Sequence, residues 1–252
     1  MKTLKDIATA RLLNQHLLRP LFTAPQEVVS WMGAMQAQDF SMCRWAVGVR
    51  MRKPSEAGVI EALNKGDIIR SHLNRSTWQL VTKEDYHWMM PLHRERSIRS
   101  WCAFAKQSGN PISDKMMDNS RELLTNILGG KKHLTREDII PFYQEIDIDN
   151  AHTVRHLLAV AEAEGIIHNG CTDGRKITYR LYGKDENKFG CLPKEEALAR
   201  LATKYFQSHR HTRRFCMVER ITGERMPYRN GTDILCADRK NDKRYGIFPA
   251  RE

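Results

Sequence analysis

The sequence predicts a mainly α protein of the α+β class, built from tandem winged helix-turn-helix units with short β-hairpin wings. Short segments with a helical apolar period end at clear stop signals. Each group of these segments precedes two short runs rich in β-branched and aromatic residues, which is the pattern of a hairpin. This order, helices followed by a hairpin, occurs twice along the 252 residues.

The first group opens with a helix from about residue 3 to 18, which Pro20 closes. A second helix follows Pro25, and a third is capped by Ser55 and stopped by Gly66. The runs "IIRSHL" and "TWQLV" then form a hairpin around the turn-prone "NRS". Two further helices complete the group, the first of them opened by a T-x-x-D capping box.

The second group repeats the outline. Thr135, with Asp138 three positions later, caps the helix "REDIIPFYQEI". Asn150 can cap "AHTVRHLLAVAEAEG", whose Gly165 suits a left-handed C-terminal position. A hairpin follows, with "IIHN" and "ITYRLYG" on either side of the glycine-rich "GCTDGRK".

Basic residues in this second group suggest contact with DNA. Arg155 and His156 lie on the polar side of the second helix, and a helix fits the major groove. A solvated helix face explains these two residues equally well. Arg175 and Lys176 lie at the loop tip, where we favour contact with phosphate.

The composition of the chain limits the cellular compartment and the kinds of partner that we expect. The net charge of +11 makes nucleic acid, here double-stranded DNA, a plausible partner. No apolar run is long enough to span a membrane, and the N-terminus lacks a signal-peptide pattern, so we expect a cytoplasmic protein. The six cysteines form no C-x-x-C pair, which predicts reduced thiols and no metal site.

Several motifs resemble a known family. They are "MGAMQAQDF", "WAVGVR" and "RSHLNRSTWQLVTKEDYHWM", followed later by "TREDI", "LLAVAEAEGII" and "ALARLATKYFQSH". Together they resemble the tandem winged-helix DNA glycosylases of the azinomycin-resistance type, which unhook alkylated-purine crosslinks. The resemblance covers about residues 4–209, and it marks the family more specifically than the activity.

In the branch of this family with a Gln–apolar–Gln motif, both glutamines are catalytic. The resemblance places these roles on Gln36 and Gln38, with Ala37 between them. A sister branch has Asp in place of the second glutamine. One departure is Gln79, which stands after the tryptophan where the family often has histidine. From the residues alone, a polar helix end that hydrogen-bonds the backbone is the alternative.

The chemistry of alkylated purines explains how glutamine can serve. An N7- or N3-alkylated base already carries positive charge, so it leaves without a strong general acid and without a cofactor. A glutamine carbonyl can orient water or face a developing cation. Gln36 and Gln38 share one side only if their segment is extended, so the helix must end near Gln36. Asp39 is an acidic helper or a local cap, and we prefer the cap.

The R-x-H-x-x-R-x-T-W segment supplies further candidates for DNA contact. Alternate residues of a strand share a face, so Arg70 and His72 can line one surface. Arg75 lies in the turn, where it can touch phosphate. We expect Trp78 to be a core residue rather than a stacking platform.

The chain departs from the family after "YFQSH". The family continues with a third winged-helix unit that opens like A-T-L-x-D-F-V-W-W-S-G, whereas this chain reads "RHTRRFCMVERITG". Met217 followed by Val218 fixes a tryptophan codon one base forward, and permitted codons let the rest read A-T-L-A-D-F-V-W-W-S. This tail also holds 11 basic against 6 acidic residues, or +5 of the net charge.

We therefore assign residues 1–130 to a first winged-helix unit with additional helices and 131–209 to a second unit with a following helix. Residues 210–252 are an atypical tail that we interpret as out of frame. The leading function is excision of alkylated purines from DNA. The alternatives are a non-catalytic DNA-binding or regulatory protein and a protein-interaction module.

Overall fold

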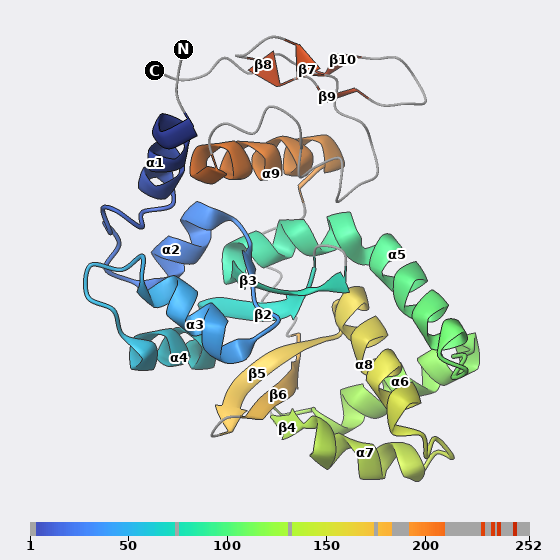
Figure 1. Cartoon of the computed structure of the whole chain (residues 1–252). Coiled ribbons are helices and arrows are strands. Elements are labelled where there is room, and N and C mark those ends of the chain that lie inside the picture. The colour runs from blue at the N-terminus through green and yellow to red at the C-terminus, as the bar shows by residue number, and fades with distance from the viewer. Residues whose placement is uncertain are drawn as a thin grey trace.

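The computed structural model describes residues 4–73, 76–130, 133–173, 176–182 and 192–209, with four two-residue strands between 228 and 245. Within these residues the protein is mostly helical with small antiparallel sheets, in agreement with the α+β class (Figure 1). The helices are α1 (Leu4–Asn14), α2 (Pro25–Met32), α3 (Phe40–Gly48), α4 (Glu56–Lys65), α5 (Lys83–Gln107), α6 (Asp114–Ile127), α7 (Arg136–Gln144), α8 (Ala151–Glu164) and α9 (Lys194–His209). The strands are β1 (Met35–Gln36), β2 (Ile68–His72), β3 (Trp78–Thr82), β4 (Leu134–Thr135), β5 (Ile167–Asp173), β6 (Lys176–Leu181), β7 (Tyr228–Arg229), β8 (Asp233–Ile234), β9 (Cys236–Ala237) and β10 (Arg244–Tyr245).

The first sheet lies among α2, α3 and α4, and its strands run in the order β1-β3-β2. The hairpin of β2 and β3 was predicted, whereas the two-residue β1 was not. Ser55 caps α4, because its Oγ accepts the N–H of Gly58 at 2.9 Å. Gly66 ends α4 with φ 80°, a conformation that favours glycine. The predicted start and stop of this helix are therefore confirmed.

The second sheet is formed by the chain that follows α6, and its strand order, β4-β6-β5, is equivalent to that of the first sheet. The capping box is present, since Thr135 Oγ1 accepts the N–H of Asp138 at 3.2 Å and the Asp138 carboxylate accepts that of Thr135 at 2.9 Å. Asn150 Oδ1 accepts the N–H of His152 at 2.8 Å, and Gly165 ends α8 with φ 76°. The predicted start of α7 and the predicted start and end of α8 are therefore confirmed.

The two groups of elements pack against each other through common hydrophobic core clusters. Leu124 of α6, a helix within residues 1–130, lies in a core cluster with Leu157 of α8. Leu201 of α9, a helix within residues 131–209, lies in a cluster with Tyr86 of α5. Helix α8 also packs along α5 and is buried over most of its length (Figure 1). The second group is therefore held firmly against the first.

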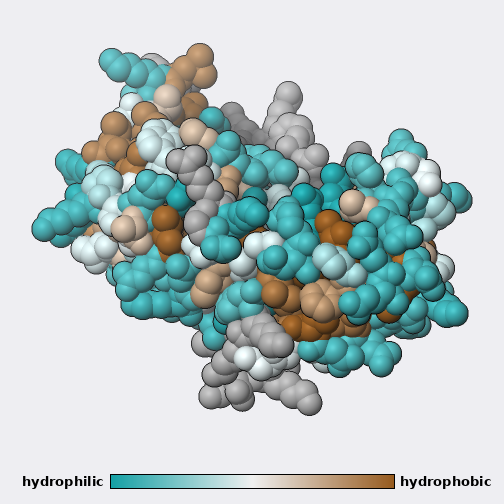
Figure 2. Space-filling model, turned by 90° about the horizontal axis from the view of Figure 1, so that it is seen from below, coloured by the Kyte–Doolittle hydropathy of each residue, from teal (hydrophilic) through white to brown (hydrophobic). Residues whose placement is uncertain are grey.

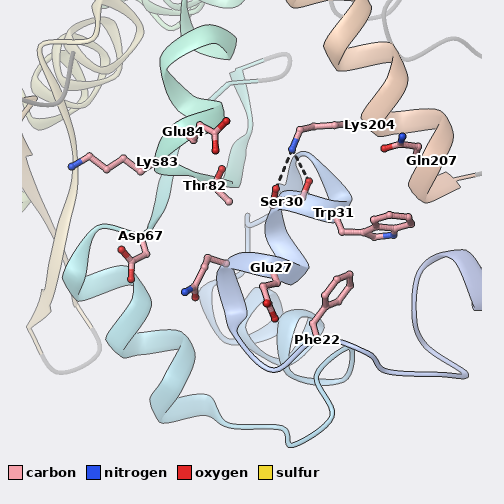
Figure 3. Close-up of a pocket in the computed structure, with 11 residues that line it drawn as sticks. Phe22, Glu27, Ser30, Trp31, Asp67, Thr82, Lys83, Glu84, Lys204 and Gln207 are labelled. Carbon is pink, nitrogen blue, oxygen red and sulfur yellow. Dashed lines mark hydrogen bonds between the residues drawn. The ribbon is translucent and has the colours of Figure 1, made fainter. Parts of the chain in front are cut away.

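Lys204 joins α9 to the first group of elements. Its Nζ donates to the buried carboxylate of Asp85 at 2.7 Å and to the backbone oxygen of Ser30 at 2.8 Å. The other carboxylate oxygen of Asp85 accepts the indole N–H of Trp88 at 3.0 Å. Figure 3 shows Lys204 reaching from α9 to Ser30 at the edge of a pocket of about 670 Å³. Thr82 caps α5 as expected, by accepting the N–H of Asp85.

On the face shown in Figure 2 the described residues form a largely hydrophilic surface with separate hydrophobic patches. Helix α1 contributes no buried residue, and Leu4 of its predicted apolar stripe is 87% exposed. Among the described residues, no helix has the length and apolar character needed to cross a membrane. The predicted atypical tail, residues 210–252, lies outside the described residues apart from strands β7 to β10.

Candidate functional site

The segment that carries the paired glutamines is extended. Helix α2 ends at Gly33, whose φ is 78°, and the chain then runs into β1. Ala37 is fully buried, and its N–H donates to the carbonyl of Trp78 on β3 at 2.8 Å. Gln36 and Gln38 on either side of it are exposed. The condition set by the sequence, a helix that ends before Gln36 so that both amides share one side, is therefore met.

Both glutamines line one open pocket of about 770 Å³. Neither side-chain amide is hydrogen bonded to another residue that the structure describes, so both are free to bind water or a ligand. Arg50 and His209 also line the pocket, from the end of α3 and the end of α9. Burial lowers the pKa of His209, with Arg50 nearby acting in the same direction. The pocket thus brings together the segment after α2, the helix α3 and the C-terminal end of α9.

Asp39 forms the cap that we preferred from the sequence. Its side chain accepts the N–H of Met42 at 2.9 Å and so starts α3 directly after Gln38. This bond ties the second glutamine closely to the first turn of a helix. The carboxylate is exposed at the pocket rim.

Arg70 is buried behind the glutamines, with 4% of its surface exposed. Its Nε donates to the carbonyl of Ala37 at 2.9 Å, and its guanidinium lies 4.0 Å from the ring centroid of Trp78. Its other nitrogens lie 3.4 Å from Asn169 Oδ1 and 3.5 Å from the carbonyl of Gln38. Burial lowers the pKa of Arg70. The DNA contact expected at Arg70 does not fit this placement, because its donors point into the protein and support the glutamine segment.

His72 shares a face with Arg70, as the strand alternation predicts. Its ring centroid lies 3.7 Å from that of the half-buried Trp78. Its Nδ1 meets the buried carboxylate of Glu162 on α8. His72 is therefore turned toward the second group of elements, and this placement also differs from the expected DNA contact. Arg75 lies outside the described residues.

The basic residues of the second group are divided between surface and interior. Arg155 and Lys176 are exposed, as contact with phosphate requires. His156 is instead 2% exposed, and its ring faces Trp101 of α5 at a centroid distance of 6.0 Å. Burial lowers the pKa of His156, and α5 covers the side of α8 that was expected to be open. Arg175 lies outside the described residues.

Sequence reasoning did not single out three residues that the structure brings to this region. Trp45 lines the glutamine pocket and is 62% exposed. His209 lines it from α9, and no local pattern points to a residue so distant in sequence. Glu162 is 1% exposed, and its place one helical turn after the buried Leu158 could have indicated this burial.

No metal centre is found within the part of the chain that the structure describes. No group of three or more His, Cys, Asp or Glu side chains there could hold an ion. Three described cysteines are free, and burial raises the pKa of the Cys43 thiol beneath the glutamine pocket. A buried thiol with a raised pKa is a poor nucleophile at neutral pH. Cys43 is therefore a poor candidate for chemistry in this pocket.

Comparison with known proteins agrees with these features. A protein-family model described as "DNA glycosylase AlkZ-like" matches residues 29–214. Among solved structures, the chain is similar to the Streptomyces sahachiroi DNA glycosylase AlkZ, with a TM-score of 0.64 and 19% sequence identity. This match covers 83% of the present chain and 58% of that chain, and at such identity it shows a shared fold. No protein with a curated description matches the sequence.

Proposed function

The chain belongs to the AlkZ-like DNA glycosylase family, and from this premise we propose that it hydrolyses the N-glycosidic bond of alkylated purines in DNA. Gln36 and Gln38 are the proposed catalytic residues. The observation that carries this proposal is the pair of exposed amides on one side of an extended segment, in one pocket of about 770 Å³. A pair of free amides suits a site that must hold water and face positive charge, because amide carbonyl oxygens accept hydrogen bonds and carry partial negative charge.

The proposed reaction needs little acid–base chemistry from the protein. A neutral base leaves poorly unless it is protonated, and most glycosidases use two carboxyl groups for such work. A purine alkylated at N7 or N3 is already cationic and leaves as a neutral base. One amide carbonyl then orients the attacking water, and both amide dipoles favour the oxocarbenium-like transition state. This mechanism calls for no metal or organic cofactor.

Support of the amide pair comes from behind the pocket. The Arg70 guanidinium donates a hydrogen bond to the carbonyl of Ala37, and this charge-assisted bond fixes the backbone between the two glutamines. We therefore propose Arg70 as a positioning residue rather than as a DNA contact. His72 and Glu162 join the same region to α8, so the second group of elements also supports the site.

We further propose that each group of elements is a winged-helix unit and that the pair binds double-stranded DNA in the cytoplasm. The repeated order of helix, short strand, two helices and hairpin, with equivalent strand orders, supports this proposal. Arg155 and Lys176 are the exposed phosphate contacts that we retain, together with Arg75 and Arg175 from the sequence. Because α8 is largely buried, its DNA contacts are restricted to its exposed N-terminal residues.

Release of the free base tests the proposed function. Duplex DNA methylated at guanine N7 is incubated with the full chain, and free N7-methylguanine is measured by chromatography. We expect release by the wild type and loss of at least about 100-fold in Gln38→Ala, comparable to removal of one transition-state dipole. Gln26→Ala, which removes an amide from a different pocket, is the matched control and should retain the wild-type rate.

A neutral lesion sharpens the test. Duplex DNA containing deoxyuridine should yield no free uracil, because this neutral base would depart as an anion, and amide dipoles that face a cation do not stabilise that charge. Duplex binding without any release of N7-methylguanine would reject the catalytic proposal in favour of a non-catalytic DNA-binding protein.

A further inference from the structure

Trp45 is unlike the other tryptophans of the chain. It is 62% exposed, whereas the other four are buried or half-buried. Trp31 and Trp88 use their indole N–H groups in hydrogen bonds, and Trp78 and Trp101 pack against neighbouring rings. The Trp45 ring has neither a hydrogen bond nor a ring contact with any residue that the structure describes. A large flat apolar surface is thus left open to a ligand.

This open indole lies in the glutamine pocket. Trp45 and Met42 both line it from α3, and Met42 is 55% exposed. They are three positions apart on the helix, so they share one face. Cys43 and Val47 take the buried face of α3 and anchor it in the first core cluster. The exposed pair is therefore carried by a firmly packed helix rather than by a loose segment.

The position of α3 fixes the indole relative to the candidate catalytic groups. The helix begins at Phe40, two residues after Gln38, and is capped by the Asp39 carboxylate. Five residues of helix place Trp45 about 7.5 Å further along the axis. An aromatic face and two free amides thus border one pocket. Stacking on an aromatic ring and polar contacts to the edge are the two ways in which proteins hold an unpaired base.

We propose that Trp45 is a stacking platform for an unpaired nucleobase in the glutamine pocket, with Met42 extending its apolar surface. The proposal rests on the proposed function, since it specifies how the same pocket takes its ligand. A base stacked there would bring its sugar toward Gln36 and Gln38. Because every base has a flat π face, the platform selects for an unpaired base rather than for one sequence.

Binding to a duplex with a single-base bulge tests this platform without any need for catalysis. The bulged base is 2-aminopurine, whose emission falls when it stacks on an indole, and the comparison duplex is fully paired. We expect Trp45→Ala to bind the bulged duplex about 5- to 150-fold more weakly than the wild type, with little change on the paired duplex. Trp45→Phe should retain most of the affinity, since it keeps an aromatic face.

Leu21→Ala is the matched control, because Leu21 is a similarly exposed apolar residue at 52% that does not line the pocket. It should bind both duplexes as the wild type does, and circular dichroism should show that all variants are folded. Equal binding of the bulged duplex by Trp45→Ala and the wild type would overturn the proposal. An equal loss on both duplexes would also overturn it. So would unchanged DNA binding together with a loss of self-association in Trp45→Ala, measured by size-exclusion chromatography, because the exposed indole would then be a contact between copies of the chain.

The outcome is separable from that of the glycosylase proposal. A bulge-specific loss in Trp45→Ala, in a protein that releases no N7-methylguanine, supports the platform and rejects the catalytic function. Release that depends on Gln38 but not on Trp45, with unchanged bulge binding, supports the catalytic function and rejects the platform.

Discussion

Replacing Arg70 with lysine tests whether a buried guanidinium holds the glutamine segment. The Nε–H bond to Ala37 is 2.9 Å long, and the cation lies 4.0 Å from the centroid of Trp78. A bond from a charged donor contributes about 1.5–3 kcal/mol, and a desolvated cation–π contact contributes about 2 kcal/mol. The contacts at 3.4 and 3.5 Å contribute little. Lysine keeps the charge but lacks the planar fork, so it retains part of each interaction.

We expect Arg70→Lys to lower the free energy of unfolding by about 2–4 kcal/mol, which is about 4–16 °C in melting temperature for a chain of this size. Urea unfolding followed by circular dichroism measures this change. The release of N7-methylguanine should also fall at temperatures where the variant is fully folded, since the backbone between the glutamines is less firmly held. That second readout separates positioning from stability alone.

Arg200→Lys is the matched control for this variant. Its guanidinium also lies over a tryptophan, at 5.3 Å from the Trp88 centroid, but its side chain is 37% exposed. It pairs with the exposed Glu84 and lies 3.8 Å from the buried Asp85 carboxylate, which keeps Lys204 as its closer partner. Exposed pairs contribute about 0–1 kcal/mol. If Arg70→Lys costs no more than this control and leaves base release unchanged, the positioning role of Arg70 is refuted.

Three further predictions concern α9, acid stability and DNA binding. Lys204→Met removes the ammonium partner of the buried Asp85 carboxylate and leaves it the guanidinium of Arg200 at 3.8 Å. It should therefore cost about 3 kcal/mol, the low end for a broken buried pair, in thermal or urea unfolding, whereas a cost below about 1 kcal/mol would contradict the buried ion pair. Burial lowers the pKa of His93 to about 4, so its contribution to stability is present above the unfolded pKa of about 6.5 and is lost as pH falls toward 4. Between pH 7 and pH 5 this amounts to about 2 kcal/mol, and urea unfolding of His93→Gln at the two values should lack that loss. Arg155→Ala and Lys176→Ala should each weaken duplex binding on all sequences and reduce the slope of log K against log salt by about 0.9, and an unchanged slope would exclude phosphate contact at that residue.

Local signals in the sequence predicted the starts of α4, α7 and α8, whereas the first helix ends at Asn14 instead of near residue 18 and α3 was not predicted. The caps at Ser55, Thr135 and Asn150 depend on a side chain and an N–H two or three residues away, so the sequence contains both partners. Strands β1 and β4 were missed because two residues are too few to show an alternating pattern. The extended conformation at Gln36 was nonetheless inferred, since catalysis by two glutamines required it.

Burial of the site residues depends on partners that are distant in sequence. Arg70 lies beside Asn169, and His72 beside Glu162, so the second group of elements decides that both strand residues face inward. His156 was expected on an open face of α8, but α5 packs there. The spacing of apolar residues within one helix or strand cannot show that these polar side chains are buried, because their partners meet them only in the tertiary structure.

The most direct measurement of the central claim is the single-turnover rate of N7-methylguanine release by the wild type, Gln36→Ala, Gln38→Ala and the double variant. If the two amides act together on one water, each single change should lower the rate by about 100-fold or more. The double variant should then be about as slow as the slower single variant, because groups that act as a unit are not additive. Release by the double variant at the wild-type rate would contradict a catalytic role for the amide pair.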